Sequence, residues 1–277
     1  MADRATIGNV QIAVFVDVAP PPFETSRFFP DAAPDSWASY KQWLDQDGKF
    51  RTNFCFFLLR SSGRTILVDT GLGPGPHERF GGATGQLMAK LSAEGVKPED
   101  VSAVVITHLH GDHVGWNTIT QQGGTPRPTF PKARYYIPKG DWEHFSKSNP
   151  GYAPLAQVTP LAQKGVAEFV EGDFAVTPEL TMLSTPGHTP GHLSVLISSA
   201  GQKGIIVGDL YHNPVQVTEL DWCAGADMNK DDARKSRKAA TQRMVNENMT
   251  VAAPHFWYPS NIGKVVRLSG KTVWKSL

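Results

Sequence analysis

The sequence predicts an α+β fold in which layered β-sheets are covered by helices. Short strand-like apolar runs alternate with a few helical patterns along the 277 residues. No repeat of about 20–50 residues is visible, and no low-complexity linker divides the chain. We therefore expect one domain over residues 1–277, in which residues 1–50 supply a first strand and an elaboration rich in aromatic residues and proline.

The composition excludes several classes of protein. The chain is 40% hydrophobic and 10% aromatic, and its formal net charge of +1 gives no field that would attract nucleic acid or an acidic membrane surface. Its two cysteines, Cys55 and Cys223, are too few for a disulfide framework or a thiolate metal site. No apolar run approaches the roughly 18 residues of a membrane span, and no signal peptide is recognisable. We expect a soluble, cytoplasmic protein.

The first half of the chain is predicted to be rich in strands. Apolar and β-branched residues predict a strand over residues 10–18 and a hairpin around the Ser-Ser-Gly turn of FCFFLLRSSGRTILVDTG. The segment from Pro20 to Trp43 is expected to be irregular, with a short helix near SWASYKQWL. QLMAKLSAEG has helical spacing that ends at Gly95. VSAVVIT (101–107) is continuously apolar, which predicts a strand buried on both faces.

The second half continues this alternation. ARYYIP predicts a strand, and KGDWEHFSKS predicts a short amphipathic helix. FAVTPELTMLSTPG and HLSVLISSAGQKGIIVGDL are expected to supply further strands separated by turns. DDARKSRKAATQRMVNENM is the longest helical pattern, with Asp231 or Asp232 as its expected N-cap. KVVRLSGKTVW predicts a final hairpin.

Three histidines and an aspartate crowd the segment directly after a predicted buried strand. The motif THLHGDHVGW contains His108, His110, Asp112 and His113. Neutral imidazole and carboxylate groups are typical zinc ligands. Alternate side chains of an extended segment point the same way, so His108 and His110 can reach one ion. Gly111 permits a tight turn that directs the next two side chains elsewhere. The spacing therefore favours two adjacent metal ions over one.

Further candidate ligands follow other predicted strands. Because each of these strands leads into a polar loop, we expect side chains from several loops to meet at one rim. The candidates are His188 and His192 in STPGHTPGH, Asp209 in IIVGDL, His212 just after it, and His255 in AAPHFWYP. His77, in a glycine-proline loop, and His144, on an amphipathic helix, are expected to be ordinary surface or core histidines.

These motifs resemble those of the metallo-β-lactamase superfamily. THLHGDHVGW is similar to the HxHxDH signature of that family. The other family motifs have counterparts in the same order, namely ILVDTG (66–71), STPGHTPGH (184–192), IIVGDL (205–210) and APHFWYP (253–259). The resemblance covers about residues 60–275. It implies an αββα sandwich with a metal site at the edge between the two sheets.

The resemblance also implies a set of metal ligands. One metal would be held by His108, His110 and His188, the other by Asp112, His113 and His255, and Asp209 would bridge both. Asp69 in VDTG matches a position that orients a ligand or its loop, whereas His192 matches a structural position outside the ligand set. We expect two divalent metal ions. Zinc is the first expectation, and manganese, iron or cobalt would also suit these ligands.

A site of this kind would perform hydrolysis. Two divalent cations outweigh the charges of Asp112, Asp209 and a bridging hydroxide, so the site would stabilise an anionic transition state. Metal ions also lower the pKa of water from about 15.7 toward about 7. The expected reaction is attack of the metal-bridged hydroxide on an electrophilic carbonyl or phosphorus. Asp112 is expected to relay a proton to the leaving group.

The finer resemblance is to the branch that contains methyl parathion hydrolase and related lactonases. The chain shares the GDxxH continuation of that branch, from Gly208 to His212. It implies a lactonase or esterase with promiscuous phosphotriesterase activity, or alternatively an organophosphate (aryl phosphotriester) hydrolase. Acyl-homoserine lactonases carry a tyrosine where His212 stands, so His212 is the catalytic candidate for contacting substrate or leaving group, with Tyr211 as the weaker one. Homodimers are common in this branch.

Other activities stay open as alternatives. The best-known β-lactamases of the superfamily carry a cysteine where Asp209 stands. Glyoxalase II recognises glutathione through a basic C-terminal region that has no match here. A nuclease would need a basic face, but KDDARKSRKAATQR mixes basic and acidic residues as a solvated helix does. A non-catalytic metal-binding module would be expected to lack some of the ligands.

Aromatic residues predict an apolar substrate. Many crowd the N-terminal elaboration, which could fold over the metal cleft and line a pocket. The candidate pocket residues are Phe23, Trp116, Tyr211, Phe256 and Trp257. We expect the partner to be a small apolar ester, lactone or phosphotriester, and neither nucleic acid nor a membrane.

Overall fold

The strands form two large sheets and one small one. The computed structural model describes residues 3–120 and 124–277. The first seven-stranded sheet has the order β1 (Asp3–Ile7), β2 (Val10–Val18), β3 (Phe54–Ser61), β4 (Arg64–Val68), β5 (Val101–Val105), β8 (Arg134–Pro138) and β9 (Ala167–Val170). The second has the order β10 (Phe174–Thr177), β11 (Leu180–Ser184), β12 (Leu193–Ser199), β13 (Gln202–Ile206), β14 (Thr250–Ala252), β15 (Ile262–Leu268) and β16 (Lys271–Ser276). A separate pair consists of β6 (Thr118–Ile119) and β7 (Arg127–Pro128).

Short helices and turns connect these strands. The α-helices are α1 (Thr25–Phe28), α2 (Leu87–Ala93), α3 (Gly111–Val114), α4 (Lys139–Ser148), α5 (Thr159–Gln163), α6 (Val215–Thr218) and α7 (Lys230–Asn246). The 3-10 helices are η1 (Pro34–Trp43), η2 (Glu78–Phe80), η3 (Pro98–Asp100), η4 (Ala153–Gln157) and η5 (Gly208–Leu210). Within the described ranges, no helix is both long and apolar enough to cross a membrane.

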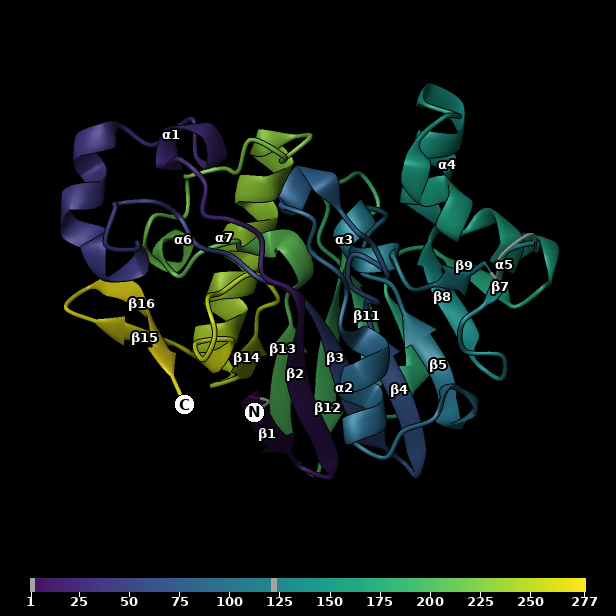
Figure 1. The fold of residues 1–277 in the computed structure, drawn as a ribbon. Helices are drawn as coiled ribbons and strands as arrows, with labels where there is room; N and C mark the ends of the chain where they lie inside the picture. Colours follow the sequence, from purple (N-terminus) through teal and green to yellow (C-terminus); the bar gives the residue numbers. More distant parts are fainter. Residues whose placement is uncertain (1–2, 121–123) are drawn as a thin grey trace.

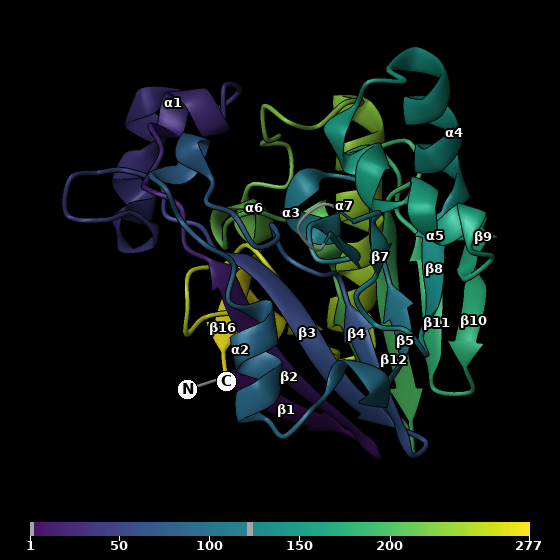
Figure 2. The ribbon, with the colours of Figure 1, turned by 45° about the vertical axis from the view of Figure 1, so that its right-hand side comes forward.

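The two large sheets pack face to face, with helices on both outer faces (Figures 1 and 2). Side chains from both sheets share the central core, as Val105 of β5 and Ile206 of β13 do. The outer face of the first sheet packs against α2 and α4, and that of the second sheet packs against α7. This four-layer arrangement confirms the predicted αββα sandwich.

Individual strands follow the sequence pattern closely. Ala103 and Val105 of β5 lie in the central core, whereas Val101 and Val104 lie in the core under α2. This strand is therefore buried on both faces, as predicted. The β3–β4 hairpin turns at Ser62 and Gly63, whose φ angles of 51° and 72° suit the two-residue turns that match strand twist. The N-terminal aromatic residues also gather as expected, in a cluster that includes Phe29, Trp37 and Phe50.

Two local predictions need correction. The N-cap of α7 is Asn229, whose side chain accepts hydrogen bonds from the backbone N–H groups of Asp231 and Asp232, so neither aspartate caps the helix. Both lie in its first turn, where a carboxylate is still favourable beside the positive end of the helix dipole. The helix expected near SWASYKQWL is the 3-10 segment η1, which begins earlier, at Pro34.

The topology brings the candidate ligands to one edge. Strand β5 is parallel to β4 and β8, and β13 is parallel to β14. Parallel strands end at the same edge of a sheet, so the segments after β4, β5, β13 and β14 emerge side by side. These segments carry Asp69, His108, Asp209 and His255. In both views α1 and α3 lie toward this end of the strands (Figures 1 and 2).

Candidate metal centre

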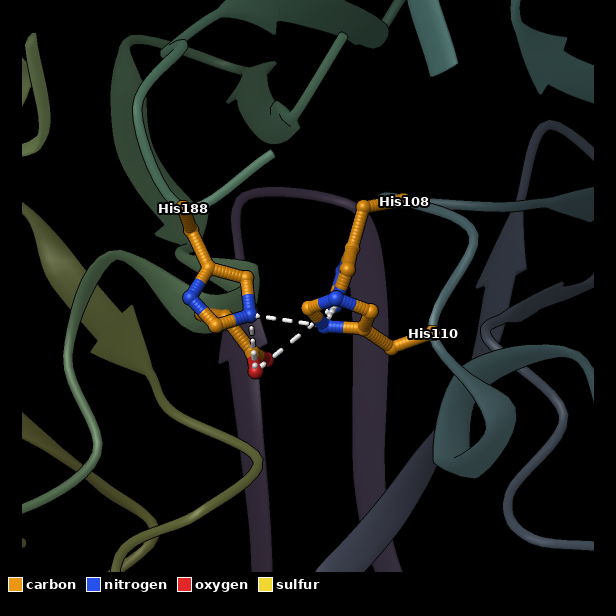
Figure 3. Close-up of side chains that lie close together, drawn as sticks. His108, His110 and His188 are labelled. Atoms are coloured by element: carbon orange, nitrogen blue, oxygen red, sulfur yellow. Dashed lines mark hydrogen bonds and ion pairs between the residues drawn. The ribbon is translucent and has the colours of Figure 1, made fainter. Parts of the chain in front are cut away.

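Four side chains from three loops converge on one point. His108 and His110 follow β5, His188 lies between β11 and β12, and Asp209 lies in η5 after β13. The Nδ1 atom of His110 lies 3.0 Å from Nε2 of His108 and 2.9 Å from Nε2 of His188. Asp209 Oδ2 lies 3.1 Å from Nε2 of His188 and 3.7 Å from Nε2 of His108. Figure 3 shows the ring nitrogens of the three histidines facing one another.

A second group lies beside the first and shares Asp209. Asp112 and His113 come from α3, and His255 follows β14. Asp209 Oδ1 lies 3.1 Å from Nε2 of His113 and 3.0 Å from Nε2 of His255. Asp112 Oδ2 lies 3.6 and 3.7 Å from the same two nitrogens. The two carboxylate oxygens of Asp209 therefore face different groups, as a bridging ligand requires.

The unsatisfied atoms of these groups fit two cations. His113 Nε2, His255 Nε2 and Asp209 Oδ1 are buried, and none has a hydrogen-bond partner among the described residues. In the first group two pairs of imidazole nitrogens lie 2.9–3.0 Å apart, and the nitrogens of a pair repel each other unless one carries a proton and the other does not. A cation at the centre of each group removes this repulsion and satisfies every atom. The His and Asp donors suit zinc and similar divalent ions.

The pKa shifts of the cluster depend on whether burial or the neighbouring charges dominate at each residue. Burial lowers the pKa of His108 and of His110 well below the usual value, which favours the neutral form that binds metal. Burial would lower the pKa of His113 as well, but the carboxylates of Asp209, Asp112 and Asp69 outweigh it and raise that pKa. Burial would raise the pKa of Asp209, but the surrounding histidines hold it well below its usual value.

Asp69 fixes the orientation of His113. The Nδ1–H group of His113 donates to Asp69 Oδ2 at 2.8 Å, which directs Nε2 toward the second group. Asp69 Oδ1 accepts the backbone N–H of Thr107 at 2.8 Å, so the same carboxylate also anchors the start of the loop that carries His108 and His110. The carboxylate therefore lies one contact away from the cluster, a position from which it can orient a ligand.

Asp227 contacts His188 in the way that Asp69 contacts His113, and this residue was not predicted from the sequence. The Nδ1–H group of His188 donates to Asp227 Oδ1 at 2.8 Å. The fully buried Arg237 of α7 donates to Asp227 Oδ2 at 3.2 Å and to the backbone carbonyls of Leu210 and Leu220 at 2.9 Å each. This network joins α7 to the loop that follows Asp209. Asp227 lies in an irregular loop with no motif around it, so the sequence carries no local signal for it.

Two further outer contacts were also missed. Asp141 of α4 accepts the backbone N–H groups of Leu109 and Gly191 at 2.9 and 2.6 Å, which ties the loops carrying His110 and His188 together. The Nδ1–H group of His255 donates to the backbone carbonyl of Asn53 at 2.7 Å. Asp141 looks like an ordinary first-turn aspartate in the sequence, and a backbone acceptor leaves no signal in the sequence at all.

His192 lies beside the cluster but its nitrogens are already used. Its Nδ1–H group donates to the carbonyl of Thr185 at 3.0 Å, and its Nε2 accepts the backbone N–H of Asp209 at 2.9 Å. Burial, with a further contribution from the charge of His188, lowers the pKa of His192 to about 3. The contact leaves no room for a side chain at position 208, because a Cβ on Gly208 would lie 2.5 Å from His192 Nε2. His77 and His144 lie outside both groups.

His212 lies against the shared carboxylate. Its Nε2 atom is 3.2 Å from Asp209 Oδ2, and its ring stacks on that of His255 with centroids 5.3 Å apart. Its backbone N–H donates to Gln216 Oε1 at 2.6 Å, which fixes the chain at this position. Burial lowers the pKa of His212, so its neutral form is favoured.

A cavity of about 440 Å³ opens over the two groups. Its floor contains His110, Asp112, Asp209, His212 and His255. Its walls come from the N-terminal elaboration, from residues near β3 and from η2, and they include Phe23, Arg27, Phe28, Thr52, Phe54, Arg79 and Phe80. Of the predicted pocket residues only Phe23 lines this cavity.

The other four predicted pocket residues point elsewhere. Tyr211 neighbours His212 in the chain but turns into the core under α7, where its hydroxyl lies 2.5 Å from Thr241 Oγ1. Phe256 packs on Trp274 with ring centroids 4.9 Å apart. Trp257 is 40% exposed and stacks under Arg51, outside the cavity.

Trp116 belongs to the core of the first sheet. Its Nε1–H group donates to Asp17 Oδ1 at 3.2 Å. All four corrections have one cause: proximity in sequence to a metal motif does not fix which way a side chain turns.

Substituting Asp227 is expected to weaken metal binding. In Asp227→Asn the uncharged side chain no longer stabilises His188 in its ligand orientation, so metal affinity should fall about tenfold to a hundredfold. Competition with a chromophoric chelator measures the affinity. Asp231→Asn, an exposed position in the first turn of α7, is the matched control and should bind metal as the wild type does. Equal affinities in the two variants would contradict this role of Asp227.

Comparison with known proteins places the chain in a family. A family model described as "Metallo-beta-lactamase superfamily" matches residues 48–255 of the chain. An N-acyl homoserine lactonase from Bacillus cereus is 31% identical over 166 residues, which are 54% of this chain and 60% of the relative. One from Bacillus sp is 30% identical over 158 residues, which are 52% of this chain and 57% of the relative. The chain thus spans about 60% of the length of the curated relatives that it matches.

Solved structures share the whole fold. AidC, described as a dizinc quorum-quenching lactonase in complex with a product, has a TM-score of 0.82 at 22% identity, covering 100% of this chain and 97% of that one. A hydrolase of the beta lactamase superfamily, AbOPH, has the same TM-score at 24% identity with the same coverage. At these identities the likeness shows the fold alone. With the profile spanning most of the chain and the sandwich in place, the protein belongs to the metallo-β-lactamase superfamily.

Proposed function

We propose that this protein is a dinuclear metal-dependent hydrolase that cleaves lactones and esters, and that N-acyl homoserine lactones are the first substrates to test. The observation that carries the proposal is the position of Asp209 between two groups of ligands, with one carboxylate oxygen toward each. The curated relatives named as N-acyl homoserine lactonases support the choice of substrate. Zinc is the proposed metal because histidine and carboxylate ligands predominate.

The proposed set of metal ligands consists of seven residues. They are His108, His110 and His188 for one metal, Asp112, His113 and His255 for the other, and Asp209 for both. Two divalent ions bound there would supply Lewis acidity and lower the pKa of water. Asp69 and Asp227 hold His113 and His188 in the orientations that the site needs.

Asp112 is the proposed proton carrier. Its side chain is 20% exposed, whereas that of Asp209 is 5% exposed, so Asp112 is the more accessible carboxylate of the cluster. It also lines the cavity, where a substrate would lie. A carboxylate in this position can take a proton from the attacking water and deliver it to the leaving oxygen.

His212 is the proposed hydrogen-bond donor to the substrate. It lines the cavity beside Asp209, and Gln216 holds its backbone in place. A neutral imidazole there can donate to the carbonyl oxygen or the leaving oxygen as negative charge develops.

Substitution of His212 separates an effect on catalysis from an effect on metal binding. In His212→Asn we expect kcat to fall about a hundredfold, the usual effect of removing one transition-state donor, while metal content stays unchanged. His144→Asn, on α4 and outside the cluster, is the control. Steady-state kinetics with metal analysis on the same samples makes the measurement. A wild-type kcat in His212→Asn would exclude this role.

The walls of the cavity suit an apolar acyl group. Phe23, Phe28, Phe54 and Phe80 surround the space above the ligands. Phe28 lies edge-on to His212 with centroids 5.5 Å apart, and Phe54 lies edge-on to His255 at 5.8 Å. These rings exclude water from the floor and offer apolar contact to a bound chain.

A substrate panel tests the proposal. The metal-loaded protein is assayed with N-acyl homoserine lactones of increasing chain length, a simple lactone, aryl esters, a dialkyl aryl phosphotriester and a cephalosporin. We expect kcat/KM to be highest for lactones or esters and to rise with the length of the apolar chain. Phosphotriester turnover far above the others would instead favour an organophosphate hydrolase. Failure to hydrolyse any lactone or ester would contradict the proposal.

A further inference from the structure

Two arginines at the cavity over the metal groups have no acidic partner. Arg27 belongs to α1 and Arg79 to η2, and both line the cavity. Both are exposed to solvent. Throughout residues 3–120 and 124–277, neither guanidinium lies within ion-pair distance of a carboxylate. Two unpaired cations thus border the space that a substrate would enter.

The two arginines have the same local setting. Arg27 is followed by Phe28 and Arg79 by Phe80, and all four side chains line the cavity. The guanidinium of Arg79 lies over the ring of Phe80, with 5.6 Å from Cζ to the ring centroid. Each segment therefore contributes an aromatic ring and a guanidinium next to it. The cavity combines apolar walls with a pair of positive charges.

Neighbouring acidic residues do not cancel this charge. Glu24, the acid nearest to Arg27 in sequence, lies 3.1 Å from Lys49 and is paired with it. Glu78 precedes Arg79, but adjacent residues of a helical turn do not face each other, and Glu78 does not line the cavity. The carboxylates in the lining are Asp112 and Asp209, both within the proposed ligand set.

We infer that the preferred substrate carries a carboxylate at the end of an otherwise apolar chain. Arg27 and Arg79 bind this carboxylate, while the ester or lactone of the substrate lies over the two groups of proposed metal ligands. Arginine suits the task because its planar guanidinium donates two parallel hydrogen bonds to a carboxylate. The positive pair also attracts an anionic substrate toward the cavity before contact. The inference rests on the proposed function and narrows its substrate class.

The kinetic test uses matched pairs of esters. One member is the para-nitrophenyl monoester of a straight-chain dicarboxylic acid, and the other has a terminal carboxamide in place of the carboxylate, over a series of chain lengths. We expect the metal-loaded wild type to prefer the carboxylate at one length by about fivefold or more in kcat/KM, the size of two exposed ion pairs. The preference should shrink with added salt and disappear in the double variant Arg27→Gln/Arg79→Gln. Arg127→Gln, exposed on β7, should keep it.

A binding measurement separates this inference from the proposed function. Ether analogues of both chains, in which an ether replaces the scissile ester, are titrated calorimetrically into metal-loaded wild type and double variant. Tighter binding of the carboxylate ether to the wild type alone supports the inference, even if no ester is hydrolysed and the proposed function fails. Equal binding of the two ethers, or a carboxylate preference that persists in the double variant, would overturn the inference. A carboxylate preference that persists in the double variant would mean that the carboxylate binds at the metal ions instead.

Discussion

Asp112→Ala is expected to reduce kcat by about three orders of magnitude, within the range that general acid–base groups contribute. The variant loses one proposed ligand of the second group and the proposed carrier of the proton at the same time. Its Tm should change little beyond the effect of weaker metal binding, because the side chain of Asp112 is partly exposed. Initial rates on the preferred lactone, measured with metal in excess, give the result.

Two companion variants identify the cause. Asp112→Asn keeps the shape of the side chain and one ligand oxygen but cannot carry a proton, so its kcat should also be low while its metal content stays closer to that of the wild type. Asp35→Ala, an exposed aspartate of η1, should be fully active. Normal turnover in Asp112→Ala would show that the carboxylate is neither a needed ligand nor a proton carrier.

Removal of the metal ions is expected to destabilise the fold. Four of the five histidines in the two groups are at most 3% exposed, Asp209 is 4% exposed, and His110 is partly buried. Among the residues that the structure describes, no hydrogen bond compensates His113 Nε2 or His255 Nε2. Each ion bound far above its Kd stabilises the native state by about 4 kcal/mol, so stripping both should lower the Tm by about 15 °C or more.

Thermal unfolding before and after chelation measures this effect. Restoring zinc should return the original Tm, and the rise should depend on zinc concentration, as linkage between binding and folding requires. Magnesium, which prefers oxygen ligands, should not restore it. A Tm that is the same with and without metal would mean that these side chains do not bind cations in the native state.

Most of the architecture could be predicted from the sequence because its strands coincide with runs of apolar residues. VSAVVIT and VQIAVFVDV have uninterrupted β-branched and apolar residues, and both form strands of the first sheet. The HxHxDH spacing, together with the polar residues after β13 and β14, identified side chains that the topology does bring to one edge. A strand end fixes the position of the next few residues, so local sequence sufficed for them.

The contacts that could not be predicted join segments far apart in the sequence or depend on the direction in which a side chain points. Asp227 contacts His188 from 39 positions away, and its loop contains no pattern that distinguishes it from a surface turn. Tyr211 and His212 are adjacent, yet one turns into the core and the other toward the metal groups. Arg79 reaches the cavity through a short 3-10 turn in a glycine-rich loop. Only the folded arrangement of distant segments decides such contacts.

The most direct test of the central claim is a zinc titration of the metal-free protein that follows hydrolysis of the preferred lactone. With Asp209 shared between two groups of ligands, the structure predicts that activity reaches its plateau at two equivalents of zinc per chain. It also predicts that Asp209→Asn has no comparable plateau, because both ions lose their common ligand. A plateau at one equivalent, or activity that is independent of zinc, would contradict a dinuclear catalytic centre.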